Sequence, residues 1–331
     1  MSINRREMLA ATAAASLAAP AAHAADSHPP LSNLAASPEA RSLYAYLWSI
    51  YRKHTLTGQQ ELPWPRQKAR RELDYIQVCS GKLPAILGLD YILPQDWPGV
   101  ADRATRWYRD EGGIPTICWH WGAPDVGVGY ENSKKDFDVA AAFRAGTPQN
   151  KAMGRDLSAV ADQLAILRDR RVPVLWRPFH EFSGTWFWWG KHGPDAFKAL
   201  WNLMYEYFTV ERRLDNLIWV LGYAGQNIDR AYYPGRDRFD VIGADIYVHD
   251  HGNLADMFGQ VRRLVGDSAP ICLHENGPIP DPATLGPQAD WLWFMTWHSP
   301  FILDGTTNSR EEIARYFQSE RYLTKDELPK F

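Results

Sequence analysis

Two glutamates, Glu181 and Glu275, are the residues of this 331-residue chain whose type and spacing best fit a chemical role. Each ends a short apolar run and directly follows a histidine, and they lie about 94 residues apart in sequence. Two carboxyl groups facing each other across a cleft can hydrolyse a glycosidic bond, because one protonates the leaving oxygen while the other, ionised, attacks the anomeric carbon. The alternative is two surface glutamates near helix starts.

Short apolar runs that recur along the chain, each ending in polar or aromatic residues, predict the strands that carry these groups. There are eight such runs: Leu56–Glu61, Pro84–Tyr91, Pro115–Trp121, Pro173–Glu181, Leu217–Tyr223, Val241–Val248, Pro270–Glu275 and Phe294–Phe301. Helical apolar spacing lies between them, for example over Leu157–Leu167 and Phe197–Phe208. Eight alternating strand–helix units predict an α/β fold, a (β/α)₈ barrel in a single domain over 25–331. A doubly wound sheet is the alternative, but the chain has no glycine-rich turn of that fold.

The barrel predicts where functional groups gather, since catalytic side chains of this fold lie at the carboxyl ends of the strands. A separation of about 94 residues is three units of about 31, which matches ~250 residues over eight units. Glu181 and Glu275 therefore end the fourth and seventh strands, over one cleft. The polar residues that end the runs are Glu61, Asp90, Tyr91, His120, His180, Glu181, Asp245, Tyr247, His274, Glu275, Trp297 and His298. The long insert 122–150 is expected to form a wall of that cleft.

Arg177 is unusual because it lies inside the fourth apolar run. A charge inside a barrel needs a paired partner, for which Asp245 and Glu275 are the candidates. Arg177 would then orient a nucleophilic carboxylate and keep it ionised, or form a buried ion pair without a catalytic role. Tyr247 alternates onto the same face as Asp245, from which it can donate a hydrogen bond to the nucleophile. His180 faces the cleft only if the strand end is irregular.

The aromatic content, with 15 Trp, 15 Tyr and 13 Phe, exceeds what a core needs. Tryptophan suits the apolar C–H faces of sugar rings, since it combines a large apolar body with one N–H group. We expect a sugar-binding lining at the strand ends from Trp121, Trp186, Trp188, Trp189 and Trp297. The alternative for about half of these rings is that they plug the barrel mouth.

Composition and motifs exclude several classes of function. A net charge of −3 gives no sign of the strongly basic character that is typical of nucleic-acid-binding proteins. Beyond the N-terminus no segment approaches the ~20 unbroken apolar residues of a membrane span. Neither His–Glu pair extends into a zinc-protease motif, and the chain has no nucleophile-elbow or phosphate-loop motif, so we expect no metal and no cofactor.

The N-terminal segment has the features of an export signal. Arg5 and Arg6 precede a short apolar stretch, and Ala22-His23-Ala24 matches a signal-peptidase site. We expect 1–24 to be a signal peptide of the twin-arginine type and the mature chain to be a periplasmic or secreted monomer.

At these residues the chain resembles glycoside hydrolase family 26, the β-mannanase family among the (β/α)₈ retaining glycosidases. The resemblance rests on Val174–Glu181, Gly184, Trp186–Gly190, Gly58–Glu61, Pro84–Tyr91, Trp119–Trp121, Gly243–Tyr247, Glu275–Gly277 and Trp297. It spans nearly the whole mature chain, although the insert 122–150 is less familiar.

The resemblance implies a retaining endo-β-1,4-mannanase acting on mannan, galactomannan or glucomannan, with Glu181 as acid/base and Glu275 as nucleophile. It also implies that Tyr247 hydrogen-bonds the nucleophile, that His120 and His180 contact the sugar, and that Trp186 and Trp297 frame the cleavage site. Alternatives within the family are a mixed-linkage β-glucanase, a β-1,3-xylanase or an exo-acting mannobiose-releasing enzyme. Outside it, the alternative is a non-catalytic carbohydrate-binding barrel.

Overall fold

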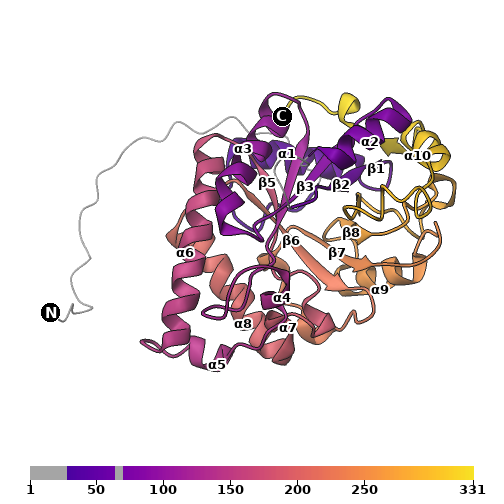
Figure 1. Ribbon diagram of the computed structural model, residues 1–331. Coiled ribbons are helices and arrows are strands. Elements are labelled where there is room, and N and C mark those ends of the chain that lie inside the picture. Colours follow the sequence, from indigo (N-terminus) through magenta and orange to yellow (C-terminus); the bar gives the residue numbers. More distant parts are fainter. Residues whose placement is uncertain (1–27, 64–69) are drawn as a thin grey trace, which may run out of the picture.

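Eight parallel strands close into a barrel in the computed structural model, which describes residues 28–63 and 70–331 (Figure 1). The strands follow one another around the barrel in chain order, and β9 pairs back with β2 through Thr296 and Gln59. They are β2 Gly58–Gln60, β3 Ile86–Asp90, β4 Ile114–Cys118, β5 Val174–Arg177, β6 Leu217–Ala224, β7 Val241–Ile246, β8 Ile271–Asn276 and β9 Phe294–Thr296. The predicted barrel is confirmed, and each strand overlaps one of the eight expected runs, with β4, β6 and β8 extending one residue beyond it. The expected signal peptide, 1–24, lies outside the described residues.

Helices surround the barrel and connect its strands (Figure 1). They are α1 Pro38–Ile50, α2 Arg71–Ser80, α3 Trp97–Arg109, α4 Tyr130–Ser133, α5 Val139–Ala142, α6 Pro148–Asp169, α7 Trp188–Lys191, α8 Gly193–Glu206, α9 Ala255–Val265 and α10 Arg310–Phe317. In the part of the chain described here, none of them is long and apolar enough to cross a membrane.

The longest helix, α6, shows how local sequence sets these elements. Thr147 caps its start by accepting a hydrogen bond from the Asn150 amide, and Pro148 fits the first turn because that position needs no N–H donor. The predicted apolar stripe from Leu157 to Leu167 is buried against the barrel.

A small outer sheet, which the sequence did not indicate, ties the end of the chain to the barrel. Strand β1, Thr55–Leu56, pairs in parallel with β10, Tyr322–Leu323, directly before β2 begins. Tyr322 is fully buried there. This sheet anchors the C-terminal segment at the amino end of the strands.

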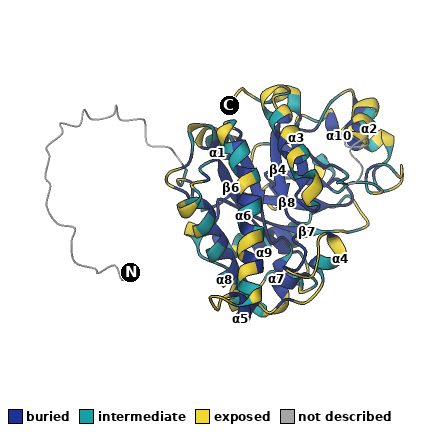
Figure 2. Cartoon of the chain, turned by 60° about the vertical axis from the view of Figure 1, so that its left-hand side comes forward, coloured by how far each residue is buried: buried dark blue, intermediate teal, exposed yellow. Residues whose placement is uncertain are grey.

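Buried ionisable side chains gather at the carboxyl ends of the strands, although Glu72, Asp240 and Asp290 are buried elsewhere. Figure 2 shows the strands as buried, with exposed residues on the outer helix faces. Among the described residues, buried ionisable side chains that follow barrel strands are Glu61, Asp90, His120, Arg177, His180, Asp245, His274 and Glu275. Buried ionisable groups need partners, so this end of the barrel is where a polar site must be built.

Candidate active site

Glu181 is positioned by an irregular turn rather than by a strand. The fourth expected run ends as a strand at Arg177, and the backbone then turns through Phe179 and Glu181, whose φ angles are 50° and 53°. Such left-handed residues are rare without glycine and concentrate at functional sites. The Glu181 amide nevertheless donates to the Gly222 carbonyl of β6, at 2.8 Å, so the turn stays attached to the barrel. The irregularity that His180 needs in order to face the cleft is confirmed.

Glu275 lies near the end of β8, where a bulge changes the pairing with β7. The register shifts from Ala244 opposite Leu273 to Asp245 opposite Glu275, which leaves His274 as the extra residue. A bulge re-aims neighbouring side chains. His274 and Glu275, although adjacent in sequence, both contact the same buried charge cluster.

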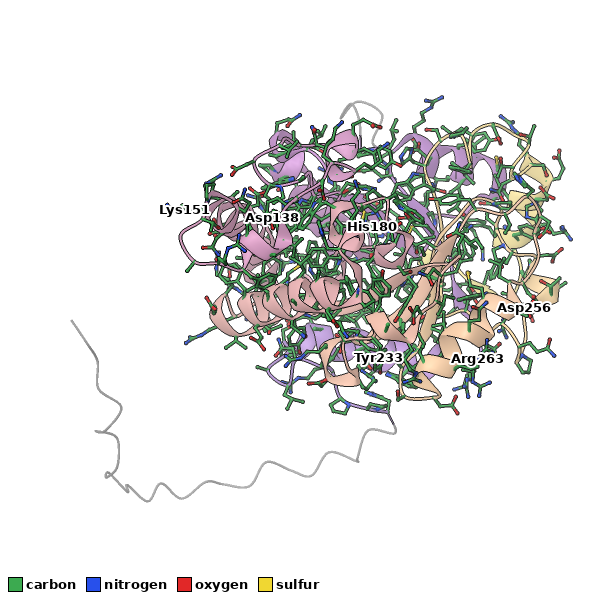
Figure 3. The ribbon with its side chains drawn as sticks, turned by 90° about the horizontal axis from the view of Figure 1, so that it is seen from below. Asp138, Lys151, His180, Tyr233, Asp256 and Arg263 are labelled. Atoms are coloured by element: carbon green, nitrogen blue, oxygen red, sulfur yellow. The ribbon has the colours of Figure 1, made fainter. Side chains whose placement is uncertain are left out.

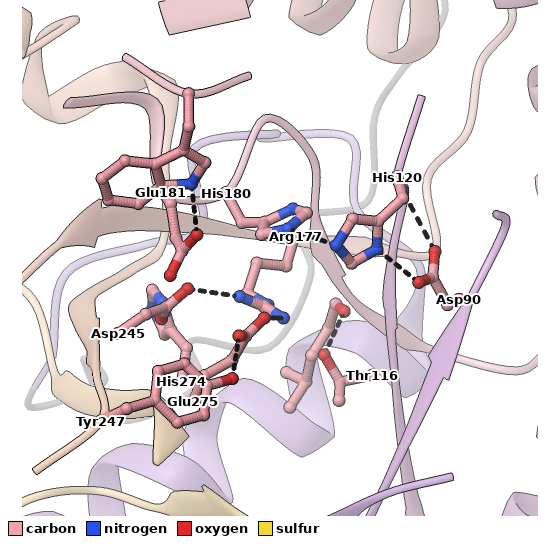
Figure 4. Close-up of polar contacts among 12 residues, drawn as sticks. Asp90, Thr116, His120, Arg177, His180, Glu181, Asp245, Tyr247, His274 and Glu275 are labelled. Atoms are coloured by element: carbon pink, nitrogen blue, oxygen red, sulfur yellow. Dashed lines mark hydrogen bonds and ion pairs between the residues drawn. The ribbon is translucent and has the colours of Figure 1, made fainter. Parts of the chain in front are cut away.

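Arg177 is the centre of that cluster (Figure 4). Its guanidinium donates to Asp245 at 2.9 Å and to Glu275 at 2.6 Å, so both expected partners are confirmed. Asp245 also bonds Nδ1 of His274, at 3.0 Å. Burial, the largest effect, disfavours the charge of Arg177, but the carboxylates of Glu275 and Asp245 raise its pKa well above the ordinary value. The cation therefore persists beside Glu275.

Tyr247 completes the hydrogen bonds of Glu275. Its hydroxyl donates to Oε2 at 2.7 Å, while Oε1 accepts from Arg177. Burial and the neighbouring carboxylate of Glu275 raise the pKa of Tyr247, so the hydroxyl keeps the proton that it donates. Both oxygens of Glu275 are thus held by donors, as expected for a carboxylate that is to stay ionised.

Glu181 and Glu275 face each other closely. One oxygen of each carboxyl group lies within 4.8 Å of the other, with Asp245 at the same range. Burial, followed by the charges of Glu275 and Asp245, raises the pKa of Glu181 well above its ordinary value. Burial also raises the pKa of Glu275, but there Arg177 opposes the shift. The two carboxyl groups therefore sit in different environments, one suited to hold a proton and one supplied with a cation.

Trp186 contacts Glu181 directly. Its indole N–H donates to Oε2 of Glu181 at 2.7 Å, and its ring is half-buried. The ring packs over Gly184, where a Cβ atom would come within 2.0 Å of it. Trp186 therefore lies directly beside Glu181.

His120 and His180 meet in front of the carboxyl groups. Their Nε2 atoms are 3.1 Å apart, and Nδ1 of His120 is 2.5 Å from Oδ2 of Asp90 (Figure 4). Seen from below, the side on which α4, α5 and α7 lie in Figure 1, His180 is near the middle of the molecule and Lys151 and Asp256 are at its edge (Figure 3).

A cavity of about 370 Å³ joins these groups. The described residues that line it are Pro63, Asp90, Ile92, His120, Tyr130, His180, Glu181, Phe187, Tyr247, Glu275, Trp297, His298 and Phe301. Both glutamates, both predicted histidines, Tyr247 and Trp297 are brought together. Tyr130 confirms that the insert 122–150 forms part of the cavity wall.

Trp121 and Trp189, which the sequence predicts in the sugar-binding lining, are both held by contacts within the protein. Trp189 is buried, stacks on Phe187 and donates to the His180 carbonyl at 2.9 Å. Trp121 is buried, stacks on Trp119 and donates to Asp156 at 2.7 Å. Neither lines the cavity of about 370 Å³, although Trp121 lines a small adjoining cavity of about 50 Å³ together with Ile92 and His120. Trp188 is fully buried in the same layer, so these rings support the cavity from behind.

Site residues that sequence reasoning missed come mainly from the loops. Tyr130, Phe301 and Pro63 line the cavity but follow no strand directly. The only signal for Tyr130 was its position in the long insert. Asp90 was recognised as a strand-end residue, but its bond to His120 was not foreseen.

Two groups of side chains in the described part of the chain bring possible metal ligands within 4.8 Å: Asp90, Cys118 and His120, and Glu181, Asp245 and Glu275. In the first group, Asp90 and His120 are already bonded to each other. In the second group, Arg177 supplies the positive charge. These hydrogen bonds and ion pairs within the protein account for the closeness of the side chains in both groups.

The family model described as glycosyl hydrolase family 26 matches residues 32–327. A mannan endo-1,4-β-mannosidase of Thermothelomyces thermophilus is 37% identical over 90% of this chain and 63% of that protein. Mannan endo-1,4-β-mannosidase B of a Piromyces species is 33% identical over 92% of this chain and 54% of that protein. The chain thus spans between about half and two thirds of the length of these relatives.

Solved structures match over the same region. A ruminal family 26 endo-β-1,4-mannanase superposes with a TM-score of 0.86 at 30% identity, covering 91% of this chain and 71% of that one. A β-mannanase from a symbiotic protist of the termite Reticulitermes speratus, solved with a gluco-manno-oligosaccharide, gives 0.84 at 33% identity, covering 91% and 98%.

Proposed function

Because this chain belongs to glycosyl hydrolase family 26, we propose that it is a retaining endo-β-1,4-mannanase whose two catalytic groups are Glu181 and Glu275. The observation that carries the proposal is the closeness of these carboxyl groups, with oxygens within 4.8 Å over one cavity. Retaining glycosidases hold their carboxyl groups about 5–5.5 Å apart, whereas inverting enzymes need about 6.5–9.5 Å to admit a water molecule. The separation here supports retention.

Glu181 is the proposed acid/base. Its raised pKa favours the protonated form, so it can protonate the glycosidic oxygen as the bond breaks. In the second half of the reaction the same carboxylate takes a proton from water, which attacks the glycosyl-enzyme. Trp186 holds one carboxyl oxygen, so the other faces the substrate.

Glu275 is the proposed nucleophile. Arg177 holds Oε1 beside a permanent positive charge, and Tyr247 donates to Oε2. These contacts orient the carboxylate and favour its ionised form. Attack on the anomeric carbon places a new bond on one of these oxygens, and the cation remains to stabilise the carboxylate when it leaves.

The substrate class rests on the relatives. The curated proteins matched are named mannan endo-1,4-β-mannosidases, and one solved relative holds a gluco-manno-oligosaccharide. His120, His180 and Trp297 line the cavity and are the proposed sugar contacts. For the whole protein we further propose export through the 1–24 leader, to the periplasm or beyond, and action as a monomer.

The experiment that tests this proposal compares galactomannan, glucomannan, lichenan and β-1,3-xylan side by side, with products resolved over time. We expect mannan-type substrates to be cut internally, giving a ladder of oligosaccharides, with the β-configuration of new reducing ends seen first by proton NMR. Release of mannobiose alone from chain ends would replace endo action by exo action. Early α-product would overturn Glu275 as nucleophile, and the absence of hydrolysis of any glycan would overturn the enzyme assignment.

A further inference from the structure

Asp90 is a buried carboxylate that the proposed reaction does not use, and it is bonded twice to one residue. Oδ1 accepts the backbone N–H of His120 at 3.1 Å, and Oδ2 lies 2.5 Å from Nδ1 of the same residue. Asp90 is 4% exposed. Because an ionised carboxylate only accepts hydrogen bonds, Nδ1 of His120 must carry a proton.

That proton determines what the other side of the ring does. A neutral imidazole with Nδ1 protonated has a lone pair on Nε2. Nε2 of His120 is 3.1 Å from Nε2 of His180, so His180 must supply the proton between them. The direction of donation is then from His180 to His120 to Asp90.

The burial of His180 supports this direction independently. Its Nδ1 has no hydrogen-bond partner among the described residues and is shielded from solvent. A buried orphan N–H group is rarer than an underused acceptor, so Nδ1 is better left as a lone pair and Nε2 protonated. Burial, followed by the charges of His120 and Arg177, lowers the pKa of His180 well below its ordinary value, which keeps the ring neutral.

We propose that Asp90 is a positioning residue: through His120 it makes this histidine pair present one acceptor, Nε2 of His120, beside one donor, Nε2–H of His180, to a single substrate hydroxyl. The proposal rests on the proposed function in taking that hydroxyl from a sugar. Both rings line the cavity that Glu181 and Glu275 share.

The match to one hydroxyl follows from its chemistry. A hydroxyl group donates one hydrogen bond and accepts others, so it can give its proton to His120 while accepting the proton of His180. The direct bond between the two rings uses this same proton and lone pair, so the sugar hydroxyl binds by replacing the His180–His120 hydrogen bond with one bond to each ring. In the reversed order, His120 would carry its proton on Nε2 and act as the donor in the cavity. His180 would then carry its proton on Nδ1, where the buried N–H has no partner among the described residues.

The unliganded protein tests the proton order without any substrate. In enzyme labelled with ¹⁵N-histidine, long-range ¹H–¹⁵N spectra distinguish an N–H nitrogen from a lone-pair nitrogen within each ring, and spectra of His120→Gln and His180→Gln assign the two rings among the ten histidines. We expect Nδ1–H on His120 and Nε2–H on His180. A doubly protonated His120, or an Nε2–H tautomer of it, would overturn the proposal.

Asp90→Asn tests the positioning role. The amide offers one acceptor and one donor, so it can satisfy the backbone N–H of His120 only by donating to the ring, which forces the Nε2–H tautomer. We expect this switch in the spectrum, together with about a tenfold loss of kcat/KM carried mainly by KM, the equivalent of one hydrogen bond. A wild-type His120 spectrum or an unchanged KM would overturn the proposal.

The matched control is Asp136→Asn, which makes the same change in the pair of Asp136 with His192, 3.0 Å apart. Neither residue lines the cavity, so kinetics should match wild type and only the His192 signals should move. Wild-type enzyme that cleaves no glycan would overturn the proposed function, whereas the spectrum of the free protein would still decide the proton order.

Discussion

The indole N–H of Trp186 donates to Oε2 of Glu181 over 2.7 Å, so the proposed acid is held by the half-buried aromatic residue beside it. This bond lowers the pKa of Glu181, against burial and the carboxylates of Glu275 and Asp245, which raise it. Trp186 therefore has two proposed roles that can be separated: its ring borders the proposed cleavage site, and its N–H tunes the proposed acid.

Replacing Trp186 by Phe keeps an aromatic ring and removes only the N–H. We expect the pKa of Glu181 to rise further, so the basic limb of the kcat/KM profile should move to higher pH. Because the residue is half-buried, the midpoint of thermal unfolding should stay close to that of wild type. An unmoved limb would show that the bond does not act on the proton of Glu181.

The wild-type pH profile should be bell-shaped, with a limb for each carboxyl group. Activity is lost as pH rises through the raised pKa of Glu181, because the acid loses its proton, and as pH falls through the pKa of Glu275, because the nucleophile gains one. Both limbs should lie above the ordinary carboxyl range. Glu181→Gln should abolish the basic limb in the residual activity, and its persistence would assign that limb to another group.

Glu275→Gln and Glu181→Ala should fail at different steps. Without the nucleophile we expect kcat to fall by several orders of magnitude on every substrate. Without the acid, an aryl glycoside whose leaving group needs no proton should still form the glycosyl-enzyme and release a burst of phenol, followed by slow turnover. A burst from Glu275→Gln, measured by stopped-flow absorbance, would contradict the assignment.

The sequence was informative wherever burial dictates residue type. Parallel strands covered on both faces are mainly apolar, so most of the barrel strands were visible as apolar runs, although β2, Gly58–Gln60, is polar. The barrel then placed Glu181 and Glu275 on one side. The pairing of Arg177 followed from the same principle, since a buried charge requires an opposite one.

Loop conformation was not predictable in the same way. Phe179 and Glu181 adopt positive φ without being glycine, because contacts with β6 impose the turn. The sequence could not show which tryptophans face the cavity, since a ring suits a core and a sugar site equally well. Trp121 and Trp189 therefore stay outside the cavity of about 370 Å³, and Tyr130 lines that cavity from a loop whose path no periodicity encodes.

Arg177→Met should reveal the cost of the buried charge cluster. The substitution leaves Asp245 and Glu275 buried without a cation, and breaking such an ion pair costs about 3–5 kcal/mol of unfolding free energy. Urea denaturation measures this loss. The control is Arg170→Met, which breaks the exposed pair with Asp102 and should cost at most about 1 kcal/mol. Equal losses in the two variants would mean that the cluster contributes no more than a surface pair.

Trp297 and Trp121 should give opposite signatures, because one ring lines the cavity and the other packs behind it. Trp297→Ala removes a half-buried ring that faces the substrate, so we expect kcat/KM to fall about tenfold or more with little change in stability. Trp121→Phe removes the bond to Asp156 and part of the stack on Trp119, so it should cost about 1–3 kcal/mol of unfolding free energy with KM unchanged. A raised KM of Trp121→Phe without a loss of stability would show that the Trp121 ring contacts the sugar after all.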